Sequence, residues 1–217
     1  MAELHADARL VREPFTDVAH QRAAVSLGMW VFIAQEVLFF GVLFVWYGLF
    51  RAQHPDVVAA GGRALDVPLA TVMTVTLLVS SFTMVLAVRS AMLGARRGLA
   101  GWLAATGLLA VAFLAMKAWE YHHHIAAGEV PVVDLHAASS VVEAGRAQFF
   151  GLYFVMTGFH ALHVVGGVLV IAWRALAAAR GRELPRWTAI MGLGLYWHLV
   201  DVVWLFVFPA LYLAGHA

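Results

Sequence analysis

The 217-residue sequence contains no cysteine. This absence excludes disulfide bonds, cysteine-ligated zinc, iron–sulfur clusters and cysteine nucleophiles. Charged residues are also scarce, because Asp, Glu, Lys and Arg together make up 12% of the chain, whereas ordinary soluble domains carry about 25%. The net charge of +1 argues against a nucleic-acid partner. A soluble enzyme, a disulfide scaffold and a nucleic-acid-binding protein are therefore all disfavoured.

Apolar residues, by contrast, make up 63% of the chain and gather in five long runs. A helix that crosses a bilayer needs about 20 mostly apolar residues, and each run is long enough. The runs cover residues 26–50, 68–91, 98–121, 147–173 and 189–213. The sequence therefore predicts an all-α integral membrane bundle of five transmembrane helices. It forms a single domain over 26–213, with a polar tail at 1–25 and a short tail at 214–217.

Prolines and the N-terminal segment support this division. Pro68 can occupy the first turn of the second helix, where its missing N–H costs nothing, and Pro209 is expected to bend or end the last helix. Residues 1–25 mix acidic with basic side chains and lack an uninterrupted apolar core with a small-residue cleavage site. We interpret them as a retained tail and not as a signal peptide.

Basic residues are distributed unevenly over the connections. Three arginines lie in the N-terminal tail, three in the connection after the second run and four in the connection after the fourth run. With five crossings these arginines all lie on one side of the membrane, and only Arg51, Arg63 and Arg146 lie on the other. Cytoplasmic loops carry such an excess of Lys and Arg. The sequence therefore predicts a cytoplasmic N-terminus and an outer C-terminus.

Ionisable side chains lie deep in several of the runs. Asp201 is near the middle of the last run, three residues after His198, and this spacing places both side chains on one helix face. An aspartate at that depth costs about 2.5–3.5 kcal/mol on insertion scales, so the pair is expected to face protein, bound lipid or water. The polar candidates within the membrane are Glu36, Glu120, His160, His163, His198 and Asp201.

These side chains are compatible with a proton relay, a metal site, a lipid-headgroup pocket or polar cross-links within the bundle. Imidazole and carboxylate suit zinc, copper or iron, and the histidines could also ligate haem. However, the paired Glu-x-x-His motifs of di-iron bundles are absent. We favour cross-links. Lys117 is expected to snorkel outward or to pair with Glu120, and the histidines at 122–124 are expected to form a solvated cluster.

Glu36 is the most difficult of these residues to explain by packing alone. Phe32, Phe39 and Phe40 lie about one turn away or nearer on its helix. A charged carboxylate is costly in the middle of a bilayer, whereas the uncharged acid needs only hydrogen-bond partners. We expect Glu36 to make structural hydrogen bonds, with proton transfer as the alternative.

The motifs on the five runs resemble those of subunit III of the haem–copper oxidases. The resemblance places the family's buried carboxylate at Glu36 and its Glu-Tyr motif at Glu120 and Tyr121. It extends from about residue 26 to residue 213, with motifs in order on all five predicted helices. The similar segments are 28–41, 77–83, 119–121, 151–164 and 196–204.

The resemblance implies an accessory, non-redox subunit of an aerobic respiratory terminal oxidase in the bacterial cytoplasmic membrane. It implies no cofactor in this chain, haem and copper in partner subunits I and II, and bound phospholipid. The implied roles are to stabilise the catalytic subunit of a proton-translocating oxidoreductase and to support proton uptake and oxygen access. Arg89 becomes a candidate contact for lipid phosphate, because guanidinium binds phosphate in a bidentate way. The chain lacks the first two helices of the seven-helix members, so a partner would supply the other wall of a lipid cleft.

Several other functions remain as alternatives. Cytochrome c is the expected electron donor, with a quinol oxidase or a subunit III-like partner of a nitric oxide reductase as alternatives within the family. A stand-alone transporter is disfavoured because the sequence has no paired repeats with broken helices at matched positions. A stand-alone membrane enzyme is disfavoured because no convincing metal or nucleophile constellation is present.

Overall fold

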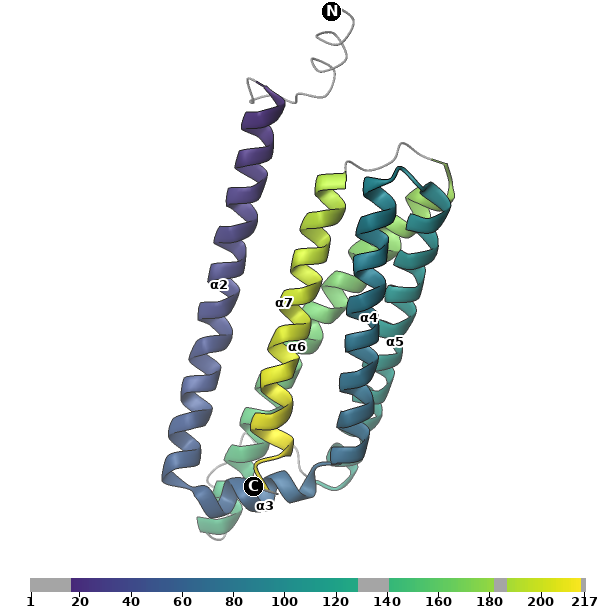
Figure 1. Cartoon of the computed structure of the whole chain (residues 1–217). Coiled ribbons are helices and arrows are strands. Elements are labelled where there is room, and N and C mark those ends of the chain that lie inside the picture. Colours follow the sequence, from purple (N-terminus) through teal and green to yellow (C-terminus); the bar gives the residue numbers. More distant parts are fainter. Residues whose placement is uncertain (1–16, 129–140, 182–186, 216–217) are drawn as a thin grey trace, which may run out of the picture. The chain divides into compact units, whose positions relative to one another are not determined.

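The computed structural model describes residues 17–128, 141–181 and 187–215. Within these residues the chain is helical apart from short turns, and no strand occurs among them. The helices described are α2 (Val18–Gln53), α3 (Pro55–Ala64), α4 (Val67–Met92), α5 (Arg96–Ala126), α6 (Val141–Ala179) and α7 (Trp187–Tyr212). All except α3 are long and apolar enough to span a membrane. The prediction of an all-α membrane protein with five spanning helices is confirmed (Figure 1).

Local sequence signals explain several of the helix ends. Asp66 caps α4, because its side chain accepts a hydrogen bond of 2.9 Å from the backbone N–H of Leu69. Pro68 lies in the first turn of that helix, as predicted. Gly94 has a φ of 66° and follows the end of α4, where Ala95 N–H bonds to Ser90 C=O at 2.9 Å. This 6→1 bond belongs to a Schellman motif, which lets α5 start at once in the opposite direction.

The chain divides into two compact units, Met1–Phe39 and Phe40–Ala217, with the boundary inside α2. The described part of the first unit is a single helical segment whose side chains are mostly apolar and exposed, such as Leu38 at 72%. The second unit contains the rest of α2 and all of α3 to α7. Every polar candidate except Glu36 therefore belongs to the second unit.

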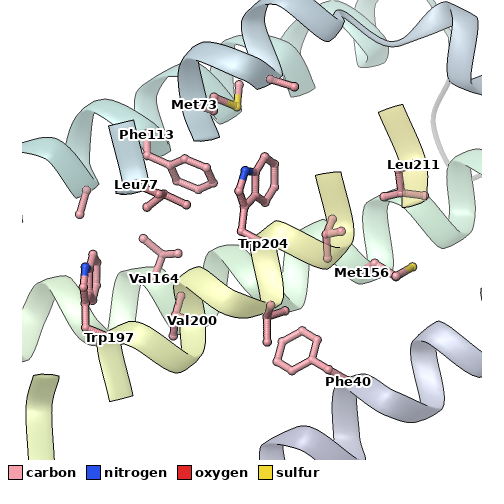
Figure 2. Close-up of a cluster of buried hydrophobic side chains, with 14 of the residues drawn as sticks. Phe40, Met73, Leu77, Phe113, Met156, Val164, Trp197, Val200, Trp204 and Leu211 are labelled. Carbon is pink, nitrogen blue, oxygen red and sulfur yellow. The ribbon is translucent and has the colours of Figure 1, made fainter. Parts of the chain in front are cut away.

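Helices α4 to α7 form a closed ring, in which α5 contacts α4 and α6, and α7 contacts both α6 and α4. Aromatic and large aliphatic side chains fill its centre (Figure 2). Phe113 of α5 meets Trp204 of α7 edge to face, with ring centroids 4.9 Å apart. The other core residues shown with them include Met73, Leu77, Val164, Trp197 and Val200. Outward-facing residues are also apolar, such as Leu108 at 72% exposure, as lipid contact requires.

Helix α3 is an element that we did not predict, and it contacts α6 and α7. Two glycines let it approach closely. A Cβ on Gly61 would lie 2.3 Å from the Phe149 ring, and a Cβ on Gly62 would lie 2.6 Å from the backbone nitrogen of Gly215. Arg63 then donates a hydrogen bond of 3.0 Å to the Gly215 carbonyl. Glycine is unfavourable inside a helix, but at these two positions the missing side chain permits close packing.

The last helix continues beyond its proline. Pro209 lies inside α7, which ends at Tyr212, so the proline does not end the helix. The nearby carbonyl of Ala210 accepts a hydrogen bond from the Tyr47 hydroxyl of α2. Helix α2 begins at Val18, well inside the predicted tail, and Asp17 accepts a hydrogen bond of 2.7 Å from the backbone N–H of His20. The rest of that tail lies outside the described residues.

Candidate functional site: polar side chains inside the bundle

A buried ammonium group joins three helices of the second unit. Lys117 of α5 bonds to Glu120 Oε2 at 2.8 Å, to the Tyr153 hydroxyl of α6 at 3.0 Å and to the Tyr212 hydroxyl of α7 at 2.8 Å. Tyr212 also donates to Glu120 Oε2 at 2.9 Å. We call these four residues the Lys117 network. An ammonium group has three N–H donors, so all of its donors are used.

Aromatic rings surround the same charge. The Lys117 nitrogen lies 4.5 Å from the centre of the Tyr153 ring and 5.5 Å from that of Trp204. Cation–π attraction strengthens when the partners are shielded from water, and Lys117 and Glu120 are only 2% and 3% exposed. The expected pairing of Lys117 with Glu120 is confirmed, and the alternative of snorkelling is wrong. The network stabilises the contact between α5, α6 and α7.

A second group of polar side chains lies between α4 and α7. Ser81 Oγ and His198 Nδ1 are 2.6 Å apart, and His198 is half-buried. Asp201, one turn further along α7, is 4% exposed. Ser81 also lies near Asp201, but neither carboxylate oxygen has a hydrogen-bond partner of normal geometry within the described ranges. The predicted common face of His198 and Asp201 is thus directed toward α4.

The hydroxyl groups of α4 also position both buried tryptophans of α7. The Trp197 indole N–H donates to Ser80 Oγ at 3.0 Å, and the Trp204 indole N–H donates to Thr74 Oγ1 at 3.0 Å. Both rings are fully buried, so an unbonded N–H in either would be costly. Helix α4 therefore fixes the rotational position of α7.

His160 and His163, both polar candidates on α6, lie in different surroundings. His160 is 1% exposed and contacts the rings of Phe113 and Trp204, with centroids 5.7 and 5.2 Å away. His163 is only partly buried, and its Nδ1 is 2.7 Å from the Phe159 carbonyl of its own helix. The ring of Phe40 lies edge to face against it, with centroids 5.4 Å apart. His160 belongs to the core, whereas His163 lies at its edge.

The remaining predicted residues are separate from these groups. Glu36 belongs to the first unit and is 7% exposed. Arg89 is exposed in the last turn of α4. The histidines at 122–124 do not form the solvated cluster that we expected, because His124 is 8% exposed and its ring contacts Phe150 and Tyr153. Helical geometry turns one of three consecutive residues toward the core.

A pocket of about 640 Å³ lies between the last turns of α2 and the first turns of α6. Most of its wall is apolar, and polar side chains occur where α2 ends. Gly151 lines it with no atom within 4 Å of the position a Cβ would take. The lining residues are Trp46, Leu49, Phe50, Gln53, His54, Ala147, Gln148, Gly151, Leu152 and Val155. Ligand sites in proteins usually occupy about 300–1,000 Å³.

Sequence reasoning found the charged members of the Lys117 network but missed its two tyrosines. Tyr153 and Tyr212 each lie in an apolar run, where a tyrosine resembles any other large core residue. The only signal was Lys117 itself, because an intramembrane ammonium needs acceptors from neighbouring helices. Which residues supply them depends on helix packing, which the sequence does not state.

These features define a multi-pass helical membrane protein with ionisable side chains inside its bundle. The family model described as cytochrome c oxidase subunit III matches residues 11–216. The chain therefore belongs to the cytochrome c oxidase subunit III family.

Named relatives include subunits of both cytochrome c and quinol oxidases. Subunit 3 of the cytochrome bo(3) ubiquinol oxidase of Pseudomonas aeruginosa is 33% identical over 92% of this chain and 90% of the relative. The cytochrome c oxidase subunit 3 of Corynebacterium diphtheriae is 35% identical over 87% of each chain. The quinol oxidase subunit 3 of Bacillus spizizenii is 31% identical, over 87% of this chain and 86% of the relative.

Proposed function

We propose that the chain is an accessory, non-redox subunit of an aerobic respiratory terminal oxidase in the bacterial cytoplasmic membrane. The observation that carries the proposal is the family match over residues 11–216, together with relatives that are subunit 3 of named oxidases. In this proposal haem and copper belong to partner subunits I and II, and this chain stabilises the catalytic subunit. Cytochrome c is the proposed electron donor.

The bonding of the buried side chains supports a scaffold role. The ammonium of Lys117 has all three N–H groups bonded within the chain. His198 is bonded to Ser81, and His163 lies beside a carbonyl of its own helix. The bonds of Lys117 and His198 cross between helices and hold them in place. In this proposal the chemistry of oxygen reduction takes place in the partner subunits. Support of proton uptake and of oxygen access remains part of the proposal, with structural hydrogen bonds as the expected role of Glu36 and proton transfer as the alternative.

The pocket between α2 and α6 supports phospholipid binding. Its apolar wall belongs to two helices that are long and apolar enough to span a membrane, and such a wall can pack against an acyl chain. Gln53, His54 and Gln148 offer hydrogen bonds to a headgroup. Arg51 and Arg146 adjoin the lining residues in sequence, and guanidinium groups bind phosphate well. Arg89, in the last turn of α4, is a candidate contact for a second lipid phosphate.

Removal of the subunit from the oxidase tests the accessory role. Oxygen consumption is followed over many turnovers in complexes with and without the chain, with reduced cytochrome c and then with a quinol as donor. We expect the initial rate to remain largely intact and the active lifetime of the enzyme to shorten. An immediate and complete loss of activity in a correctly assembled remainder would contradict the proposal.

A substitution that fills the pocket tests lipid binding. Gly151→Phe is expected to place a ring in the pocket, because Gly151 lines it and no atom lies within 4 Å of its Cβ position. We expect fewer phospholipids to co-purify with the complex, as counted by native mass spectrometry. Gly48→Phe is the matched control, since Gly48 also has open space around its Cβ position but does not line the pocket. Equal lipid counts in both variants would argue against phospholipid binding in the pocket.

A further inference from the structure

Three buried side chains around one turn of α7 have polar atoms without a partner. Within the part of the chain that the structure describes, both ring nitrogens of His160 and Oε1 of Glu120 lack hydrogen-bond partners, and the two carboxylate oxygens of Asp201 have no bond of normal geometry, although Ser81 lies near. These residues are 1%, 4% and 3% exposed. Most buried polar atoms in native proteins are bonded, so such a concentration in one bundle needs an explanation.

Trp204 connects the three residues. Its ring lies 5.2 Å from the ring of His160 and 5.5 Å from the ammonium of Lys117, which is bonded to Glu120. Asp201 precedes Trp204 by three residues on the same helix, so both lie on one face of α7. The unbonded atoms therefore surround a single turn, which we call the Trp204 turn.

The protein alone does not satisfy these atoms. A neutral imidazole has one N–H donor and one acceptor nitrogen, and both are unbonded in His160. If all five atoms remained without a hydrogen bond, the cost would be a substantial part of the free energy of unfolding of a domain. A water molecule can donate and accept at once, and buried waters typically make about three hydrogen bonds to groups of this kind.

We propose that the Trp204 turn is an internal hydration site, in which ordered water molecules bond to His160, Asp201 and Glu120. The burial of all three residues restricts the ligand to a molecule about as small as water. Among the described residues, no three His, Asp or Glu side chains are arranged to hold a metal ion, so the chemistry favours water over a cation. Among the neighbours of Asp201 on α7, the half-buried His198, one turn away, is closer to the surface of the described chain.

A density map of the native complex in lipid, at about 2 Å resolution, tests the proposal directly. We expect density peaks about 2.6–3.2 Å from the nitrogens of His160 and the oxygens of Asp201. Side chains that turn to bond one another, with no peaks between them, would overturn the proposal.

Two variants at His160 give an independent test that does not depend on map quality. Gln keeps a donor and an acceptor, whereas Leu has neither. If water is bound, His160→Leu lowers the melting temperature of the complex by about 2–4 °C, and His160→Gln lowers it less. If the site is dry, Leu removes two unbonded atoms, and the melting temperature stays equal or rises. Equal decreases in both variants would indicate packing alone and would also overturn the proposal.

Discussion

The Lys117 network and the Trp204 turn are adjacent in the bundle and share Glu120, which is bonded through Oε2 and unbonded at Oε1. Their other polar groups are satisfied in opposite ways. In the network, every N–H of the Lys117 ammonium has a partner from the chain itself. Around Trp204, His160 and Asp201 have no hydrogen bond of normal geometry within the described residues, although Ser81 lies near Asp201. The first arrangement holds three helices together through direct bonds. The second leaves atoms that only a small additional molecule can satisfy.

This difference distinguishes a structural role from a binding role for intramembrane polar residues. Burial alone does not separate them, because Lys117, Glu120, His160 and Asp201 are all at most 4% exposed. The two roles are separated by whether each polar atom has a hydrogen-bond partner within the chain. The comparison predicts that substitutions in the network cost much more stability than conservative substitutions around Trp204.

The largest effect is expected from Lys117→Met. The substitution leaves the Glu120 carboxylate buried without its cation, and breaking a buried ion pair in this way costs about 3–5 kcal/mol. We expect a large drop in the thermal stability of the subunit within its complex, measured by unfolding in lipid nanodiscs. The double variant Lys117→Met with Glu120→Gln should recover much of the loss. A single variant as stable as the wild type would show that the network is not structural.

Tyr212→Phe is expected to have a smaller effect. It removes the hydroxyl that accepts from Lys117 and donates to Glu120, and hydrogen bonds to charged groups contribute about 1.5–3 kcal/mol. Tyr196→Phe is the matched control, because the Tyr196 hydroxyl donates to a neutral carbonyl of His163 at 2.8 Å. Unfolding of both variants is compared under identical conditions. If Tyr196→Phe lost as much stability as Tyr212→Phe, the hydrogen bonds to the charged groups would have no special weight.

A pair of variants tests whether Glu36 makes structural hydrogen bonds or transfers protons. Gln keeps the shape and much of the hydrogen bonding, so Glu36→Gln should be tolerated for assembly. Glu36→Ala leaves any partner unbonded at about 1–3 kcal/mol and should reduce retention of the subunit in the complex. Retention and proton-coupled turnover are measured for both. A Gln variant that assembles normally but loses proton-coupled turnover would identify Glu36 as a relay and not as a scaffold residue.

Asp201→Asn should have the smallest effect, below about 1 kcal/mol. The amide is nearly isosteric with the carboxyl and can bond to water in its place. Thermal unfolding of the complex measures the loss of stability caused by this variant. A loss as large as that of Lys117→Met would mean that Asp201 has a charged partner and would remove the contrast between the two regions.

The sequence predicted the architecture well because its signals are strong and local. Five apolar runs, with Pro68 at the start of one helix, are sufficient to predict the spanning helices. It also gave the pairing of Lys117 with Glu120 as one of two alternatives, since a spacing of three along a helix is a local relation. It could not predict the tyrosine partners, the burial of His124 or the separation of His160 from His163. These depend on the rotation and packing of α5, α6 and α7 against each other.

Helix α3 was missed for a related reason. Glycine disfavours helix by about 1 kcal/mol relative to alanine, so Gly61 and Gly62 weaken the local preference of this segment for helix. Their value lies in tertiary contact, because a Cβ at Gly61 would lie 2.3 Å from the ring of Phe149. Packing against α6 and α7 thus outweighs the local preference.

The central claim is that this chain is a non-redox subunit of a terminal oxidase. The most direct test is to purify the tagged chain from its native membrane in mild detergent, identify the associated subunits, and record the haem spectrum and copper content. We predict that oxidase subunits I and II co-purify with haem and copper, and that the chain separated from them retains neither. Recovery of the chain without oxidase subunits, or stoichiometric haem or copper on the separated chain, would contradict the account.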